Sequence, residues 1–281
     1  MRISVVVVTY NWSQALQLVL HALARQSTLP FEVIVSDDGS RGDTRELLTA
    51  TAQNFPTRLV HLWQPDDGAR MSRARNRGIA AASSDYIVFL DGDMLAHRQF
   101  IADHVAFARR GCFVQGSRVL TGQRCAAHLL ARQQIDLGFF ASDIERRRHT
   151  LRLPALARIY ARPHTGEAGI KSCNWGFWRD DLLALNGFNE AMTGWGREDN
   201  ELALRAFHLG LERRDLRFAG LALHLWHATR KNVVDNPNDA VLAAARASGA
   251  VRCAVGLDQH LAEFAMPAPD LRAQASARPA A

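Results

Sequence analysis

The chain has 281 residues, of which 48% are hydrophobic and 22% are charged, so it can bury a sizeable core and global disorder is excluded. No apolar run approaches the ~20 residues that cross a bilayer, and the apolar start Ile3–Val8 is too short for a signal peptide, so we expect a cytoplasmic protein. The formal net charge is +6, from 34 Lys and Arg against 28 Asp and Glu.

The first hundred residues alternate strand-like and helix-like patterns. Continuous β-branched and apolar runs predict four strands, at Ile3–Thr9, Glu32–Ser36, Arg58–Trp63 and Tyr86–Leu90. Between them we expect three helices, one capped by Ser13, one at Thr44–Asn54 and one at about Met71–Ala82. This repetition predicts an α/β fold with a parallel, doubly wound sheet and helices on its faces.

The second half of the chain is less regular. Helices are expected at Arg98–Arg110, Cys125–Arg148, Asp180–Leu185 and Glu198–Leu209, and strands at Cys112–Ser117, Lys171–Phe177 and Leu221–Trp226. After Pro267 the chain is rich in Ala, Pro and Arg without periodicity, so we expect a disordered tail. Four cysteines lie far apart with no C-x-x-C pair, which favours small buried side chains over a zinc ribbon, a redox motif or a disulfide framework.

The basic excess is concentrated in residues 145–162, which hold six arginines and one glutamate. A nucleic-acid binder would spread Lys and Arg among aromatic residues along a groove-sized face, so we expect no nucleic-acid partner. The segment could instead lie on an anionic membrane, bind an acidic substrate or form a solvated loop. Pro154 interrupts any continuous helix there.

Polar clusters follow three of the predicted strands. They are Thr9-Tyr10-Asn11, Asp37-Asp38-Gly39-Ser40 and Asp91-Gly92-Asp93. Ligands of open α/β sheets bind beyond the carboxyl ends of the strands; one such cluster could be an ordinary turn, but three at successive ends indicate a binding site. The carboxylates of Asp91 and Asp93 suit a hard divalent ion, whose remaining ligands a diphosphate usually supplies.

Seven motifs carry a resemblance to a known family. They are Val5–Asn11, Ser36–Ser40, Ala74–Gly78 and Phe89–Asp93, then Asn174–Trp178, Asn186–Glu190 and Gly194–Glu201. The N-terminal half resembles a family 2 glycosyltransferase with the GT-A fold. The last series, with its Trp-Gly-x-Glu-Asp box, resembles β-1,4-galactosyltransferases and bacterial chondroitin-type polymerases. The resemblance implies one GT-A domain over residues 1–240, with a nucleotide-binding half at 1–118 and an acceptor and catalytic half at 119–240; a C-terminal helix and the tail follow at 241–281.

The resemblance also implies where a nucleotide would lie. Thr9, Tyr10 and Asn11 match the segment that receives the uracil and the ribose. Asp38 matches the carboxylate that pairs with the uracil edge, and a carboxylate can accept a hydrogen bond from the uracil imide N–H.

Further matches concern the diphosphate and the sugar. Arg75 and Asn76 match an Ala-Arg-Asn element beside the nucleotide, where an arginine can pair with phosphate. Asp91 matches the position nearer the ribose and the sugar. Trp195, flanked by glycines, is expected to stack on a sugar face, whereas Trp178 is expected in the core.

A divalent metal, Mn²⁺ or Mg²⁺, is implied at the second aspartate of the Asp-Gly-Asp turn. Asp93 matches the metal-binding member, and related enzymes place a metal-ligating histidine in the region Leu223–Asn232. The form H-x-x-R-x-N favours His227. His224 is the alternative, because alternation along a strand would put residues 224 and 226 on one face and 227 on the other.

The Glu198-Asp199 pair matches the acidic pair of the catalytic region. The resemblance gives Asp199 the role of general base and Glu198 a supporting role in contact with the acceptor or donor sugar. Standing alone, both residues could simply be helix-start acids favoured by the macrodipole. The assignment therefore depends on the surrounding Trp-Gly-x-Glu-Asp box.

Together the matches imply an inverting, metal-dependent glycosyltransferase that moves a hexose or N-acetylhexosamine from a UDP-sugar to a hydroxyl of a glycan or glycolipid acceptor. The expected setting is bacterial surface polysaccharide or lipopolysaccharide synthesis, in the cytoplasm. Contact of residues 145–162 with the inner face of the membrane is one of the three alternatives for that segment. The alternatives are a sugar nucleotidyltransferase, which should open with a Gly-rich phosphate loop, and a non-catalytic nucleotide-sugar-binding protein of the same fold.

Overall fold

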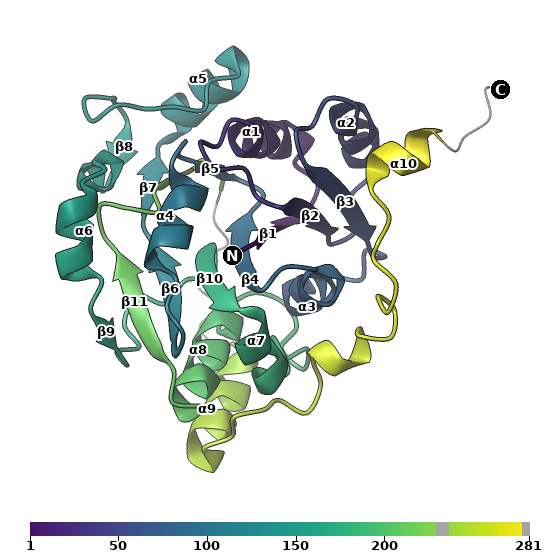
Figure 1. Ribbon diagram of the computed structural model, residues 1–281, viewed down its shortest axis with the longest axis vertical. Helices are drawn as coiled ribbons and strands as arrows, with labels where there is room; N and C mark the ends of the chain where they lie inside the picture. The colour runs from purple at the N-terminus through teal and green to yellow at the C-terminus, as the bar shows by residue number, and fades with distance from the viewer. Residues whose placement is uncertain (229–235, 277–281) are drawn as a thin grey trace.

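The computed structural model describes residues 1–228 and 236–276. Within them, eight strands form a central sheet in the order β3-β2-β1-β4-β10-β6-β11-β9, and four short strands form a second sheet in the order β5-β12-β7-β8 (Figure 1). The central strands are β1 Ile3–Thr9, β2 Glu32–Asp37, β3 Arg58–Trp63, β4 Tyr86–Asp91, β6 Cys112–Gly116, β9 Pro163–His164, β10 Asn174–Trp178 and β11 Glu212–Leu216. The second sheet contains β5 Met94–Ala96, β7 Arg118–Thr121, β8 Ile144–Glu145 and β12 Ala222–His224.

Helices cover both faces of the central sheet (Figure 1). The α-helices are α1 Ser13–Ala24, α2 Gly42–Ala52, α3 Met71–Ala81, α4 Phe100–Phe107, α5 Gln123–Arg132, α6 Pro154–Tyr160, α7 Arg179–Leu185, α8 Glu198–His208, α9 Asn238–Ser248 and α10 Leu271–Ser276, and short 3₁₀ turns lie at Arg147–Thr150 and Leu257–Gln259. No helix in the described parts of the chain is long and apolar enough to cross a membrane.

The parallel strands β2, β1 and β4 are the centre of the fold. All residues of β1 are buried, and they alternate between two hydrophobic clusters: Val5 and Val7 pack with Leu16 of α1, and Val6 packs with Ile79 of α3. A strand that is covered on both faces needs this continuous apolar run. The predicted α/β sheet is confirmed, with β10 joining β4 as an antiparallel neighbour.

Three expectations about local structure are wrong. The helix predicted at Cys125–Arg148 ends at Arg132, since Gln133 takes the left-handed conformation with φ 52°. Pro154 does not interrupt a helix but begins α6, because the first helical position needs no N–H donor. Ser13 is the first residue of α1 rather than its cap, and its hydroxyl donates to Asp43 (2.7 Å).

The expected disorder after Pro267 is also wrong for the residues described. Ala268 and Leu271 are buried, and α10 packs against α2 and β3. The guanidinium of Arg58 donates to the carbonyl of Ala268, which fixes this segment against the end of the sheet. Arg272 also donates to the carbonyls of Phe55 and Thr57 (3.5 and 3.2 Å). The segment has too few apolar residues for a periodic pattern in the sequence to predict this packing. The four cysteines are buried and unpaired.

Candidate active site

The carboxyl ends of three adjacent strands open into one cavity. β2, β1 and β4 are parallel neighbours, so the loops that follow them emerge at the same edge of the sheet. The cavity measures about 580 Å³, within the ~300–1,000 Å³ typical of small-molecule sites. All three polar clusters of the sequence contribute to its walls, through Thr9, Tyr10, Asn11, Asp38, Asp91 and Asp93.

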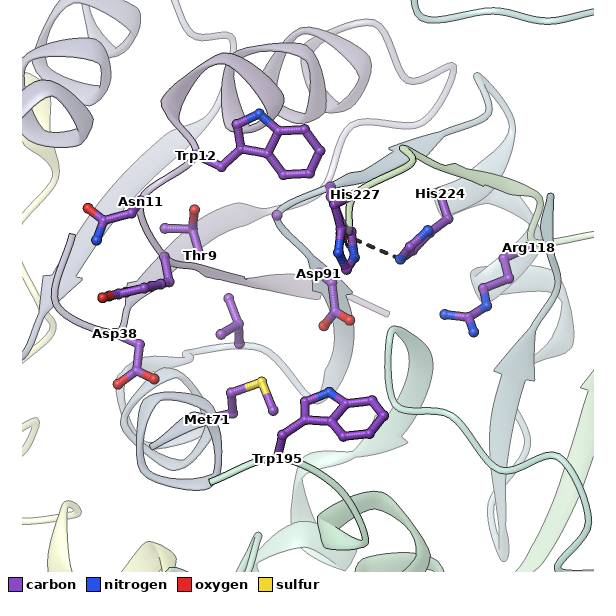
Figure 2. Close-up of a pocket in the computed structure, with 14 residues that line it drawn as sticks. Thr9, Asn11, Trp12, Asp38, Met71, Asp91, Arg118, Trp195, His224 and His227 are labelled. Carbon is purple, nitrogen blue, oxygen red and sulfur yellow. Dashed lines mark ion pairs between the residues drawn. The ribbon is translucent and has the colours of Figure 1, made fainter. Parts of the chain in front are cut away.

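Asp38 is fixed at one end of the cavity (Figure 2). Its carboxylate accepts hydrogen bonds from the backbone N–H of Arg70 (2.8 Å) and from the amide of Gln64 (2.6 Å). Burial raises the pKa of Asp38, and these two donors lower it in part. Because each carboxylate oxygen carries two lone pairs, Asp38 can still accept a further N–H from a ligand.

The loop after β1 is held open by the loop after β2. Asn11 adopts φ 48°; its N–H donates to the hydroxyl of Ser40 (2.9 Å), and its side-chain oxygen accepts the N–H of Arg41 (3.0 Å). The hydroxyl of Tyr10 donates to Asp66 (2.9 Å). These contacts hold Thr9, Tyr10 and Asn11 along one wall without occupying the cavity itself.

Gly92 makes the turn between the two aspartates possible. A Cβ at this position would lie 2.8 Å from the Val8 carbonyl and 3.0 Å from the Thr9 hydroxyl. The turn therefore lies directly against β1, which is why a residue without a side chain separates Asp91 from Asp93. Asp91 and Asp93 both line the cavity.

Asp93, His224 and His227 form a potential metal centre. One ligand atom from each lies within 4.8 Å of the others; Asp93 Oδ2 is 3.4 Å from His224 Nε2 and 3.2 Å from His227 Nε2. The other carboxylate oxygen, Asp93 Oδ1, is buried and without a hydrogen-bond partner among the described residues. A buried, unpaired carboxylate oxygen beside two imidazoles fits a divalent cation.

Both histidines, not one, reach Asp93. The expected strand at Leu221–Trp226 ends at His224, which pairs with Met94 of β5, and the N–H of Leu225 donates to the Asp93 carbonyl (3.0 Å). The chain leaves the strand before His227, so alternation does not separate the two rings. Arg230 and Asn232 of the H-x-x-R-x-N form lie outside the described residues.

The two histidines differ in their electrostatics. The Asp93 carboxylate raises the pKa of His227, chiefly through its hydrogen bond with that ring. Burial lowers the pKa of His224, and nearby Arg118 lowers it further. A neutral imidazole is the form that ligates metals, so the lowered pKa of His224 favours its metal-binding form and the raised pKa of His227 disfavours it.

Arg75 lies behind the cavity wall rather than in it. Its side chain is only 2% exposed, and its guanidinium donates to Asp91 (3.3 Å) and to Glu198 (3.3 Å). Burial alone would lower the pKa of Arg75, but the carboxylates of Asp91, Glu198 and Asp199 together raise it. Arg75 therefore links the end of β4 to the acidic pair at the start of α8.

Asn76 does not line the cavity, and its place beside the nucleotide stays a prediction. It is fully buried, and its amide donates to the carbonyl of Phe188 (2.8 Å) and to Glu190 (2.7 Å) and accepts the N–H of Phe188 (2.8 Å). These hydrogen bonds connect α3 to the segment before α8.

Glu198 and Asp199 are the first two residues of α8. Glu198 is buried and accepts the N–H of Gly196 (3.1 Å), whereas Asp199 is partly exposed and accepts the N–H of Asn200 (2.8 Å). Burial and the neighbouring Glu198 raise the pKa of Asp199 to about 6. A carboxylate with a pKa near neutrality suits general base work. Neither residue is among those that line the cavity.

Trp195 stands at the cavity mouth, half exposed at 50%. Figure 2 shows it on the opposite side of the cavity from Trp12, with Asp91 between them. Gly194 and Gly196 take φ values of 78° and 101°, which present the indole outward from the loop. The carbonyl of Trp195 accepts from Asn236 (3.0 Å), so the start of α9 supports this loop.

Several cavity residues were not singled out from the sequence. Trp12 directly precedes α1 and Met71 is the first residue of α3. Both resemble ordinary apolar residues in the sequence, yet both line the cavity. Arg118 lies in β7, at the end opposite Asp38 (Figure 2). Trp12 could have been found, since it directly follows Thr9-Tyr10-Asn11. The sequence holds no comparable signal for Met71 or Arg118.

The sequence is similar to that of known glycosyltransferases. The model of glycosyl transferase family 2 matches residues 4–166, and that of the N-terminal domain of galactosyltransferase matches residues 155–228. A validoxylamine A glucosyltransferase of Streptomyces hygroscopicus subsp. limoneus is 31% identical over 230 residues, which cover 74% of this chain and 48% of the relative. A chondroitin synthase of Escherichia coli is 26% identical over 261 residues, covering 83% and 36%. The chain thus spans half or less of the length of these relatives.

Solved structures agree on the fold. S. aureus TarS 1-349 in complex with UDP-GlcNAc superimposes with a TM-score of 0.59 at 18% identity, over 94% of this chain and 71% of that one. At that identity the likeness shows the fold alone, which is that of the GT-A glycosyltransferases. The family model covers more than half of the 281 residues. The chain therefore belongs to glycosyl transferase family 2.

Proposed function

We propose that the chain is an inverting, metal-dependent glycosyltransferase that moves a hexose or N-acetylhexosamine from a UDP-sugar to a hydroxyl of a glycan or glycolipid. The observation that carries the proposal is the single cavity that joins Asp38, the Asp91-Gly92-Asp93 turn and two histidines. Its volume and its two ends, one acidic and one able to hold a cation, suit a nucleotide diphosphate that carries a sugar.

In this proposal the uracil lies at the Asp38 end. The carboxylate of Asp38 accepts the imide N–H, and Thr9, Tyr10 and Asn11 flank the base and the ribose. Asp38 is held by Gln64 and Arg70, so it is already oriented before the nucleotide binds. Such pre-organisation reduces the entropy lost on binding.

Asp93, His224 and His227 would hold the metal ion. Imidazole ligands favour a transition ion such as Mn²⁺ over Mg²⁺, which prefers an all-oxygen shell. The ion would supply Lewis-acid stabilisation of the charge that develops on the departing diphosphate. Asp91 lines the same cavity, and its carboxylate accepts from Arg75 (3.3 Å).

Asp199 is the proposed base. Its carboxylate takes the proton of the acceptor hydroxyl while that oxygen forms a bond to the anomeric carbon, and the bond from that carbon to UDP breaks on the opposite face. Arg75 fixes Glu198 next to Asp199, and Glu198 in turn raises the pKa of the base. Attack opposite the leaving group inverts the anomeric configuration. General base assistance of this kind is worth ~10²–10⁴-fold.

The test is UDP release from UDP-galactose, UDP-N-acetylgalactosamine, UDP-glucose and UDP-N-acetylglucosamine, with Mn²⁺ or with EDTA. The panel is needed because the chain resembles both a galactosyltransferase domain and a glucosyltransferase. Release from one donor that EDTA abolishes supports the proposal and identifies the sugar. No release from any donor, together with no binding of UDP, would refute it.

For the acceptor we propose a growing bacterial surface polysaccharide or lipopolysaccharide, in line with the likeness to chondroitin synthase. Helix α6 supports contact with a membrane that carries such an acceptor. Leu153, Ile159 and Tyr160 are exposed at 46%, 59% and 46%, and the exposed arginines Arg158 and Arg162 accompany them. Apolar side chains with basic neighbours bind anionic bilayers. Flotation with anionic vesicles, but not with neutral ones, is the expected result.

A further inference from the structure

A second, smaller cavity adjoins the proposed active site. It measures about 130 Å³ and shares Arg118 with the main cavity. This volume is well below the ~300–1,000 Å³ that holds a whole small molecule, so it suits one substituent of a larger ligand. Four cationic side chains line it: Arg118, Arg146, Lys171 and Arg217.

These four cations lack acidic partners. Within the described residues, none of them forms an ion pair with a carboxylate. Asp215 also lines the cavity; its carboxylate lies 3.1 Å from Arg213 and 3.2 Å from His164, and its Oδ1 has no hydrogen-bond partner among the described residues. A concentration of uncompensated positive charge in a concave site attracts anions.

Arg118 also carries an unused donor. Its Nε is buried and without a hydrogen-bond partner among the described residues, and a terminal nitrogen of the same guanidinium has only the sulfur of Cys173, at 3.5 Å. An unsatisfied buried donor is costly, and an oxyanion would satisfy it. His149 lines the same cavity.

The positive charges around the small cavity also affect the pKa of His149. Burial lowers the pKa of His149, and the charges of Arg148, Arg146 and Arg217 lower it further. Arg146 and His149 belong to the basic segment 145–162. Other arginines of that segment have structural partners: Arg152 pairs with the buried carboxylate of Asp103 (2.6 Å).

The small cavity adjoins the metal-binding part of the main cavity. Arg118 lines both cavities, and Asp93, His224 and His227 line the main one with it. A ligand group held by Arg118 in the small cavity would therefore lie next to the main cavity and its metal centre.

We propose that this cavity binds an oxyanion carried by the acceptor, a carboxylate or a phosphate ester on the sugar that receives the hexose. The inference rests on the proposed glycosyl transfer and adds the chemical class of its acceptor. Two arginines, a lysine and the free Nε of Arg118 hold the oxyanion. Arginine forks and lysine ammonium groups both bind carboxylate and phosphate.

The test uses three probes that differ only at C6 of one sugar. They are p-nitrophenyl β-glucoside, p-nitrophenyl β-glucuronide and p-nitrophenyl β-glucoside 6-phosphate. Their dissociation constants are measured by ligand-observed NMR on the chain saturated with Mn²⁺ and UDP, which fill the main cavity. The variants are Lys171→Gln and the double variant Arg146→Gln/Arg217→Gln. The control is Arg158→Gln/Arg162→Gln, which removes the same charge from exposed positions of the basic segment outside the cavity.

The wild-type chain should bind at least one anionic probe ~10-fold more tightly than the neutral one, the effect of one charge-assisted hydrogen bond. Lys171→Gln and the Arg146/Arg217 double variant should remove most of that preference, and the control should keep it. The preferred probe then distinguishes carboxylate from phosphate.

The proposal would be overturned if the three probes bound equally, or if neither anion bound at ~10 mM, a concentration at which even a very weak site is occupied. It would also be overturned if the preference survived in both variants. The affinity for UDP is measured in parallel. If the wild-type chain binds UDP with Mn²⁺ but shows no anion preference, this inference fails while the proposed function stands. If the wild-type chain does not bind UDP, the proposed function itself is refuted.

Discussion

Replacement of Asp199 by Asn tests the proposed base most sharply. The amide has the same size and keeps a hydrogen-bond acceptor for the N–H of Asn200 (2.8 Å), but it cannot take a proton. Loss of general base assistance should lower kcat by ~10²–10⁴-fold. The donor site should be unaffected, since Asp199 does not line the cavity, so the dissociation constant of UDP should not change.

The pH dependence of kcat in the wild-type chain is a second test of Asp199 as the base. Since the pKa of Asp199 is raised to about 6, roughly half of the chains carry the ionised base at pH 6, about 90% at pH 7 and about 10% at pH 5. Because only the ionised form accepts a proton, kcat should rise through pH 6 and level off above pH 7. The assay follows transfer at saturating Mn²⁺, so that protonation of the metal-binding histidines does not contribute.

The matched control is Asp180→Asn. Asp180 also lies in the first turn of a helix, α7, but its side chain is 76% exposed and its partner Arg110 is at 3.2 Å. An exposed ion pair contributes little, so this variant should keep full activity. General base catalysis is worth far more than a threefold change in rate. If Asp199→Asn transferred sugar at a rate within about threefold of the wild type, Asp199 would not be the base. A flat wild-type profile from pH 5 to pH 8 would lead to the same conclusion.

Three further changes test other parts of the structure. His227→Ala should weaken Mn²⁺ binding at least ~10-fold in a paramagnetic titration, since even an outer-shell partner is worth that much; unchanged affinity would exclude His227 as a ligand. Arg75→Met leaves Asp91 and Glu198 without their cation and should lower the free energy of unfolding by ~3–5 kcal/mol in urea, whereas a cost below ~1 kcal/mol would mean that the bridge is weak. Leu271→Ala should cost ~2 kcal/mol if α10 is docked, and nothing if the tail is disordered.

The sheet and its ligand edge were predictable because they depend on local patterns. Ile3–Thr9 and Tyr86–Leu90 read as buried strands, and parallel neighbours necessarily bring their carboxyl ends together. The polar clusters at those ends could therefore be placed in one site without knowledge of the structure. Asp38, Asp91 and Asp93 do line one cavity. Gly92 separates the two aspartates because the turn lies directly against the backbone of β1, a contact that the motif alone only suggests.

The rest depends on contacts between distant parts of the chain. Arg118 enters the cavity because β7 pairs with β12, a partner more than a hundred residues away. Asn76 and Arg75 are adjacent in sequence and both buried, yet Asn76 accepts the backbone N–H of Phe188 whereas Arg75 donates to Asp91 at the end of β4. His224 and His227 both meet Asp93 because the strand ends between them. No periodicity encodes these long-range arrangements.

Calorimetric titration of UDP with and without Mn²⁺ examines the cavity, the nucleotide and the metal centre in one measurement. The proposed function predicts one site per chain that needs Mn²⁺, with affinity lowered at least ~10-fold by EDTA and by Asp93→Asn alike. It also predicts that Asp93→Asn leaves the fold intact, since one oxygen of that carboxylate has no hydrogen-bond partner in the described residues. UDP binding that neither EDTA nor Asp93→Asn weakens would contradict the metal centre, and no UDP binding at all would contradict the proposed function.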